Sequence, residues 1–101
     1  MSYIYTVQIN IPAELEAEFN RLYDTEHLPS LSSVPGCHKV TRYQLEKSED
    51  PNMQKYLTIY EVDSPAVVES EAWRKAREYG SWMTKIRPHM TEACRSFFKQ
   101  N

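Results

Sequence analysis

The chain has 101 residues, enough for one domain and too few for two, so we expect a single domain over residues 1–101. Its 12 basic and 14 acidic residues give a formal net charge of −2, which argues against a nucleic-acid binder and against a polybasic membrane anchor. No apolar stretch is long enough to span a bilayer, no secretory signal pattern is visible, and the two cysteines form no CxxC pair. We therefore expect a cytoplasmic protein with reduced thiols.

The first half of the chain predicts a strand, a helix and a second strand. Residues 3–11 alternate β-branched and aromatic side chains with others, as a strand does, up to Pro12. Residues 13–28 have helical apolar spacing, and the helix is expected to stop near His27 because Pro29 cannot continue the hydrogen-bond ladder. The Val-Pro-Gly turn at 34–36 then leads into a strand over residues 37–47.

The second half repeats the mixture of strand and helix. Residues 54–62 read as a strand, and Ser64 followed by Pro65 is a favourable helix start. The helical region runs to about Tyr79, with a possible break near Ser70, and residues 91–99 read as the last strand. The order β-α-β-β-α-β predicts an α+β, ferredoxin-like domain whose helices cover one face of a four-stranded sheet.

The number of large rings on the predicted strands bears on what covers the other face of the sheet. Seven rings are too many for one face of a small sheet, so some are expected on the face away from the helices: Tyr3, Tyr5, Tyr43, Tyr56, Tyr60, Phe97 and Phe98. An aromatic surface of this kind is typical of an interface, which predicts a homodimer formed through the sheet faces. The alternative is a monomer whose rings stack on the helix side and at the sheet edges.

Several segments resemble one known family. The run Phe-Asn-Arg-Leu-Tyr-Asp-Thr-Glu-His-Leu-Pro at 19–29 resembles the first-helix motif of EthD-like proteins in the dimeric α/β-barrel superfamily. The turn at 34–36 with the following Arg42-Tyr43, and the Arg-Pro-His element at 87–89, are similar to later parts of that pattern. The resemblance implies a ferredoxin-like protomer, pairing of two sheets into a barrel, and a small cavity between sheet and helices. It does not imply one reaction, because relatives include cofactor-free oxygenases, lactone isomerases, polyketide cyclases and haem-using enzymes.

The helix end supplies the candidate catalytic residues. Tyr23 and His27 are four residues apart and therefore neighbours on one helix flank. His27 could act as general acid or base, Tyr23 could donate a hydrogen bond to a substrate oxygen, and Glu26 could orient the imidazole. The structural alternative is that His27 simply caps the end of the helix.

Other candidate binding residues lie on the strands and the second helical region. His38 and Arg42 share a face if the strand alternates regularly, and together could bind a carboxylate or enolate; the alternative is a solvated basic face. Tyr43, Tyr60 and Trp82 could line the pocket, or serve as ordinary core and interface residues.

Two functions from different classes remain open. The first is an enzyme without metal or cofactor that moves a proton on a small, oxygenated or aromatic compound, as an isomerase, cyclase or oxygenase would. The second is a non-catalytic dimeric binding or accessory protein. The three histidines show no metal-ligand spacing, and no nucleotide-binding motif is present, so neither a metal nor a cofactor is expected.

Overall fold

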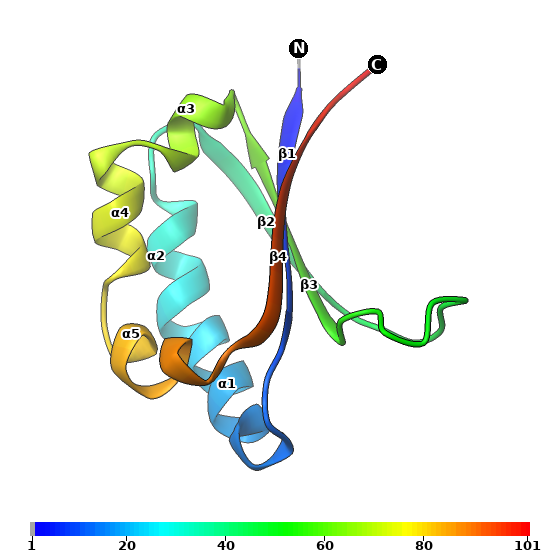
Figure 1. Cartoon of the computed structure of the whole chain (residues 1–101). Coiled ribbons are helices and arrows are strands. Elements are labelled where there is room, and N and C mark those ends of the chain that lie inside the picture. The colour runs from blue at the N-terminus through cyan, green and yellow to red at the C-terminus, as the bar shows by residue number, and fades with distance from the viewer. Residues whose placement is uncertain (1) are drawn as a thin grey trace.

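Four strands form a single antiparallel sheet in the computed structural model, which describes residues 2–101 (Figure 1). The spatial order is β2-β3-β1-β4, and all three neighbouring pairs are antiparallel. The strands are β1 (Tyr3–Asn10), β2 (Cys37–Gln44), β3 (Tyr56–Val62) and β4 (Thr91–Lys99). This order, with helical crossovers after β1 and β3, is the predicted ferredoxin-like arrangement.

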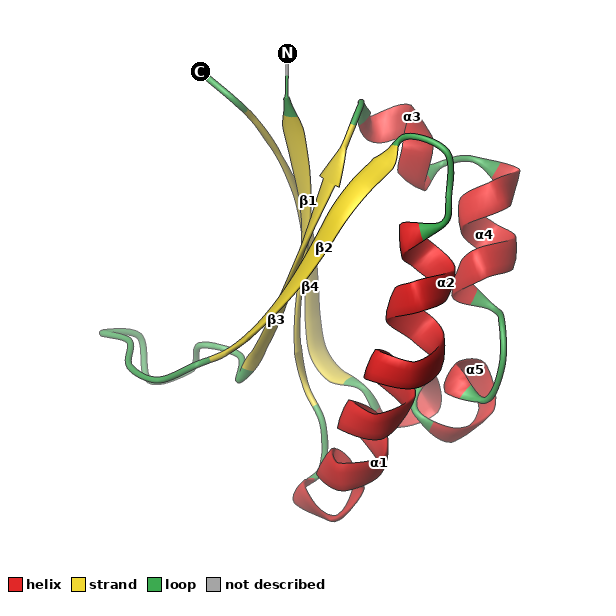
Figure 2. Cartoon of the chain, turned by 180° about the vertical axis from the view of Figure 1, so that it is seen from behind, coloured by secondary structure: helices red, strands yellow, loops and turns green. Residues whose placement is uncertain are grey.

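The helices all lie on one face of the sheet (Figure 2). The first crossover consists of the 3₁₀ turn η1 (Ala13–Leu15), α1 (Glu16–Leu22), the π-helical turn η2 (Tyr23–His27) and α2 (Leu28–Ser32). The second consists of α3 (Pro65–Val68), α4 (Glu71–Arg77), α5 (Trp82–Lys85) and the 3₁₀ turn η3 (Arg87–His89). Ser70 accepts a hydrogen bond from the Trp73 N–H, so the predicted break near this residue is an N-cap that starts α4.

The predicted end of the first helix near His27 is wrong. The helical path continues through Pro29 to Ser32, and the proline lies in the first turn of α2. Proline is tolerated there because a first-turn residue needs no intrahelical N–H donor.

The core lies between the sheet and the helices and has two clusters. One gathers around Phe19 of α1 and Ile9 of β1, and the other around Tyr5 of β1 and Tyr60 of β3. Alternate residues of the two central strands supply the sheet side of both clusters, as strand geometry requires. The candidate site described below lies where these clusters meet, because Tyr23 of the first cluster and Tyr60 of the second share a hydrogen bond.

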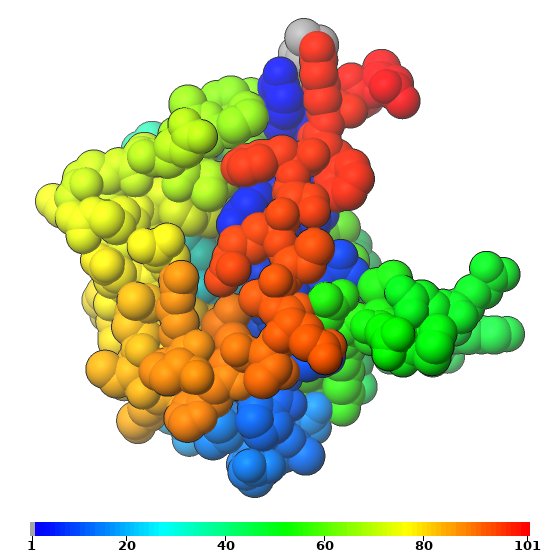
Figure 3. Space-filling model, in the orientation of Figure 1, coloured from blue at the N-terminus to red at the C-terminus, as the bar shows by residue number. Residues whose placement is uncertain are grey.

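No helix covers the opposite face of the sheet within residues 2–101 (Figures 1 and 2). The loop between β2 and β3, drawn in green, projects beyond the sheet on this uncovered side (Figure 3). Strand β2 ends at Gln44 and β3 begins at Tyr56, so this loop is longer than the sequence predicts. None of the helices in the described part of the chain is long and apolar enough to cross a membrane.

Candidate functional site

The π-helical turn η2 places two buried side chains in one pocket. The Leu28 N–H donates to the carbonyl of Tyr23, five residues back rather than four. Tyr23 and His27, at the two ends of this turn, are 2% and 5% exposed, and both line a pocket between the helices and the sheet. π turns are rare and occur frequently at functional sites. The predicted pairing of Tyr23 with His27 is therefore present, but it is built by a π turn rather than by an α-helix.

His27 lies in aromatic surroundings without a polar partner for one ring nitrogen. Its imidazole stacks on the indole of Trp82, with 4.0 Å between ring centroids and 13° between planes. The Nδ1 atom is buried and has no hydrogen-bond partner within residues 2–101. Burial, and then the positive charges of Arg87 and Arg77, lower the pKa of His27 to about 3. The imidazole is therefore neutral at physiological pH.

A pair of tyrosine hydroxyl groups lies at the same pocket. The hydroxyl oxygens of Tyr23 and Tyr60 are 2.6 Å apart, and either can donate to the other. Burial raises the pKa of both phenols, most strongly that of Tyr60, so both hydroxyls keep their protons. This pair joins the π turn to the central strand β3 and offers a hydroxyl donor or acceptor to the pocket.

Three arginines that sequence reasoning missed also line this pocket. Arg77 ends α4, Arg87 begins η3, and Arg95 lies on the helix-facing side of β4, opposite Val7. Among residues 2–101, none of the three guanidinium groups has a carboxylate within 4 Å, and the Nε of Arg77 is buried without a hydrogen-bond partner. One sign of this cluster is present in the sequence: Arg95 is a charged residue on the same, inward-facing side of its strand as Phe97.

The pocket is small as the structure stands. Its volume is about 40 Å³, close to the roughly 30 Å³ that one water molecule occupies in the liquid. Known pockets for drug-sized ligands are larger, roughly 300 Å³ or more. Trp82, one of the predicted binding residues, forms part of the wall together with Trp73 and Met90. A ligand larger than water can enter only if this wall moves.

Glu26 lies outside this pocket and does not orient the imidazole. Its Oε2 accepts a hydrogen bond of 3.0 Å from the backbone N–H of Ser81. Its carboxylate also lies against Gly80, where an added Cβ would come within 2.7 Å of Oε2. Glu26 therefore fastens the π turn to the segment between α4 and α5, whose flanking residues Arg77 and Trp82 line the pocket.

The prediction that His38 and Arg42 share a face is wrong. The β2–β3 register shifts between Cys37 and Lys39, and this bulge reverses the alternation after His38. Arg42 points to the helix side, where its guanidinium lies 4.4 Å from the Tyr23 ring centroid and donates hydrogen bonds to Asp24 and Asn20. His38 lies on the uncovered face and its Nε2 is 2.5 Å from a carboxylate oxygen of Asp63.

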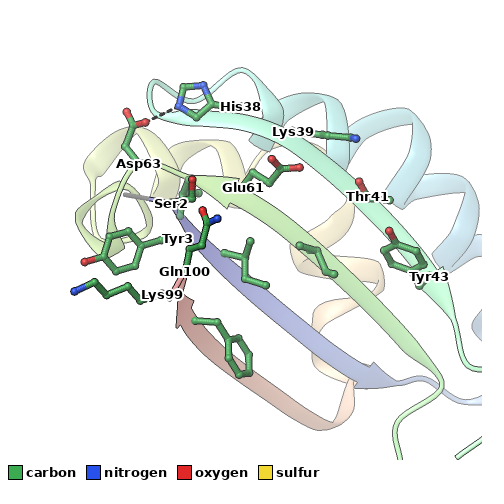
Figure 4. Close-up of a pocket in the computed structure, with 14 residues that line it drawn as sticks. Ser2, Tyr3, His38, Lys39, Thr41, Tyr43, Glu61, Asp63, Lys99 and Gln100 are labelled. Carbon is green, nitrogen blue, oxygen red and sulfur yellow. Dashed lines mark hydrogen bonds and ion pairs between the residues drawn. The ribbon is translucent and has the colours of Figure 1, made fainter.

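A larger groove of about 830 Å³ lies on the uncovered face of the sheet (Figure 4). His38 with Asp63 lies near one end of this groove, and Tyr43 near the other (Figure 4). Of the seven predicted strand rings, Tyr43 and Phe98 are on this face and are 52% and 55% exposed. The other five rings are on the helix side, so the predicted aromatic face carries fewer rings than the sequence suggests: Tyr3, Tyr5, Tyr56, Tyr60 and Phe97.

The described residues contain no group of three or more His, Cys, Asp or Glu side chains placed to share a metal ion. Both cysteines are free; Cys37 is buried and Cys94 is exposed. Burial raises the pKa of the Cys37 thiol, which leaves it a poor nucleophile. The candidate site of the described chain is therefore the pocket lined by Tyr23, His27, Tyr60 and the three arginines.

Comparison with protein families gives one match over almost the whole chain. The family described as "Domain of unknown function (DUF4286)" matches residues 2–101. No curated protein sequence matches the chain significantly.

The chain is also similar in fold to several solved structures. An EthD (ethyl tert-butyl ether) family protein from Bacillus halodurans has a TM-score of 0.71 at 9% identity, with all of both chains covered. A putative antibiotic biosynthesis monooxygenase from Bordetella bronchiseptica has a TM-score of 0.73 at 16% identity, covering 99% of this chain and 97% of that one. A haem-degrading protein from Mycobacterium tuberculosis, solved with two haems in its active site, has a TM-score of 0.68 at 15% identity, covering 97% and 94%. These likenesses confirm the predicted EthD-like, ferredoxin-like fold.

Proposed function

Because the chain belongs to the DUF4286 family and has an EthD-like fold, we propose that it is a single-domain, dimeric α/β-barrel protein that binds a small, flat, oxygen-bearing compound between sheet and helices. His27 would move a proton on that compound. The observation that carries this proposal is the buried Nδ1 atom of His27, which has no partner in the part of the chain that the structure describes.

Burial of a polar atom without a hydrogen-bond partner has a cost in folding free energy. A buried polar atom without a hydrogen-bond partner destabilises a fold by about 1–3 kcal/mol. The same pocket holds a second such atom, the Nε of Arg77, and three guanidinium groups that form no ion pair with residues 2–101. Groups perturbed in this way are concentrated at functional sites, where a bound molecule supplies the missing partners.

The proposed chemistry follows from the protonation states. A neutral imidazole offers one nitrogen as acceptor and one N–H as donor, so His27 can take a proton from a substrate carbon or hydroxyl. The Tyr23–Tyr60 hydroxyl pair can donate a hydrogen bond to the oxygen on which negative charge develops. With a pKa of about 3, His27 is a weak base until a bound ligand changes its surroundings.

Access to the pocket would require movement of the α4–α5 segment. This segment leads directly into α5, whose first residue Trp82 lines the pocket, and it is joined to the π turn through the Glu26 carboxylate. Gly80 at its centre has a φ of +74°, a conformation that glycine adopts at no steric cost. We therefore propose this segment as the gate of the pocket.

The proposed homodimer is supported by the side chains on the uncovered face. Strands β1, β3, β2 and β4 all contribute apolar side chains to it: Ile4, Leu57, Ile59, Tyr43 and Phe98. A partly apolar sheet face without a helical cover favours burial against a second sheet. The groove of Figure 4 would then lie inside the barrel.

A haem fits this pocket less well than a small flat compound. Any ligand larger than water requires the wall of the pocket, about 40 Å³ in volume, to move, and a haem would require far more movement. The haem of the Mycobacterium tuberculosis protein is therefore a property of that protein alone.

One observation favours the alternative of a non-catalytic binding or accessory protein. The flank of Tyr23 and His27 is nearly filled by neighbouring side chains rather than open to a ligand-sized cavity. An accessory protein needs only the dimer and a packed interior. The two functions differ in whether small molecules reach His27.

A fragment screen monitored by two-dimensional NMR tests the proposal. A library of small hydroxybenzoates, quinones and lactones is added to the labelled full-length protein. We expect hits that shift the signals of His27, Tyr60 and the Trp82 indole N–H, and we expect His27→Ala to weaken them. The matched control is His89→Ala, which removes an exposed histidine of η3 outside the pocket.

Two outcomes would count against the proposal. If every hit shifts only residues of the uncovered-face groove, such as Tyr43 and Thr41, the site assignment is wrong. If a hit is converted to product and His27→Ala converts it equally fast as a dimer, His27 is not the acid or base.

A further inference from the structure

We infer that the ligand of this pocket carries a carboxylate group, bound by Arg77, Arg87 and Arg95 at the side of the pocket near strand β4. This inference rests on the proposed function and names the class of ligand for the same site. The three arginines come from three different elements, α4, η3 and β4, and all line the one pocket. Their convergence is therefore a product of the tertiary fold and not of a run of charge in the sequence.

The three positive charges are close enough to repel one another. Burial lowers the pKa of Arg87, and repulsion by Arg77 and then by Arg95 lowers it further. Burial raises the pKa of the Tyr5 phenol, and all three positive charges act on this same group in the opposite direction. The guanidinium groups thus lie near one another on the same side of the pocket.

No carboxylate of the described chain compensates this charge at close range. The one carboxylate that acts on the pKa of Arg87 is that of Glu78, and its effect is the weakest of those that act on it. Glu78 is already engaged, because it accepts a hydrogen bond of 2.8 Å from Nη1 of Arg74. Arg74 lies on the same helix as Arg77 but is bound by both Glu71 and Glu78. The helix therefore has one arginine with two carboxylate partners and one arginine with none.

Arg77 supplies the second, independent observation. Its Nε is buried and has no hydrogen-bond partner among residues 2–101. A guanidinium group donates hydrogen bonds in a planar fork that matches the two oxygens of a carboxylate. A carboxylate that binds beside Arg77 would supply the acceptor that its buried Nε–H lacks among the described residues.

The aromatic wall of the pocket favours a carboxylate joined to a flat body over a free phosphate. The free volume is about 40 Å³, so either ligand needs the wall to move, and this wall includes the stacked rings of Trp82 and His27. A flat body can pack against such rings, whereas inorganic phosphate has no apolar surface to place there. The flat body would then lie beside the His27 imidazole and near the Tyr60 hydroxyl.

Binding of a carboxylate would also strengthen His27 as a base. Arg87 and Arg77 disfavour the protonated imidazole by their positive charge. A bound anion opposes both charges and stabilises the imidazolium form. A bound carboxylate would thus make His27 a stronger base. In the empty pocket, His27 would not bind a proton at neutral pH.

The test compares benzoate with benzamide, a neutral molecule of nearly the same shape. Titrations by calorimetry or NMR at low salt use the full-length wild-type protein, Arg77→Gln and Arg95→Gln. The matched control is Arg74→Gln, on the same helix but outside the pocket. We expect benzoate to bind about tenfold or more tightly than benzamide, and the preference to fall by about tenfold in Arg77→Gln and to stay in the control. Arg95 is exposed on the edge strand, so Arg95→Gln keeps the test valid if Arg77→Gln fails to fold.

Equal binding of benzoate and benzamide near His27 would overturn the carboxylate inference and leave the proposed function standing. Tighter binding of inorganic phosphate than of benzoate would overturn it as well. Failure of benzoate to bind, while neutral fragments shift His27, has the same consequence. Benzoate binding that Arg74→Gln and Arg77→Gln weaken equally would show a general charge effect and contradict the assigned arginines.

Discussion

Burial of His27 links the stability of the fold to pH. The unfolded chain protonates this imidazole near its ordinary pKa of 6.5, whereas the folded chain does so only near 3. Between these values the unfolded state binds more protons, so stability is complete above pH 6.5 and falls as the pH drops towards 3. We expect a loss of up to about 1.4 kcal/mol for each pH unit below 6.5.

Urea unfolding of His27→Gln between pH 7 and pH 5 measures this effect. The glutamine has no proton to take up, so the free energy of unfolding of the variant should change less over this interval than that of wild type. His89→Gln, at an exposed position, should keep the wild-type slope. Equal slopes in wild type and His27→Gln would mean that the imidazole titrates normally in the folded state.

At the scale of elements, the contact between η2 and the α4–α5 segment sets how easily the pocket opens. Replacing Glu26 by Ala removes the acceptor of the Ser81 N–H. We expect a loss of about 1–2 kcal/mol in the free energy of unfolding, and faster amide exchange over residues 78–86 than elsewhere. Glu14→Ala, an exposed change in η1, is the control, and unchanged exchange over 78–86 in Glu26→Ala would contradict the proposed gate.

Gly80 gives a second measure of the same segment. Its φ of +74° disfavours other residues, and an added methyl group would meet Oε2 of Glu26 at 2.7 Å. We expect Gly80→Ala to lower the free energy of unfolding by about 1–2 kcal/mol, which a lower melting temperature would report. In the Glu26→Ala background the steric part disappears, so the two changes together should cost less than their sum, and strict additivity would contradict the contact.

The elements also show what the sequence can predict. The four strands are recognisable because period-2 alternation depends on local pattern, and β4 is found at its predicted bounds of 91–99. The π turn at 23–27 and the bulge after Cys37 leave no such pattern, because each adds one residue to a regular element. These two irregularities account for the wrong end of the first helix and for the separation of His38 from Arg42.

The candidate site, like the elements, is predictable from the sequence only where its residues are close neighbours along the chain. Tyr23 and His27 are visible as close neighbours in one segment, and Tyr60 is placed beside them by the sheet. The arginine cluster is spread over residues 77–95 in three elements, so only the tertiary fold brings it together. The sequence shows that these three residues are charged, but it does not show that their guanidinium groups lack carboxylate partners within residues 2–101.

At the scale of the whole molecule, the account requires that two uncovered sheet faces meet. Phe98 lies on this face, whereas Tyr79, another exposed ring, lies at the end of α4 on the helix side. Phe98→Glu places a charge in the proposed interface and should disrupt it, while Tyr79→Glu should leave it intact. Both rings are more than half exposed in the protomer, so neither change should by itself unfold the chain.

Native mass spectrometry of the full-length protein, purified without removal of bound molecules, tests this account most directly. The account predicts a mass twice the 11.9 kDa of one chain, with up to one small molecule added for each protomer. It also predicts a monomer for Phe98→Glu and a dimer for Tyr79→Glu. A wild-type protein that remains a bare monomer at micromolar concentration would contradict the barrel and the pocket built upon it.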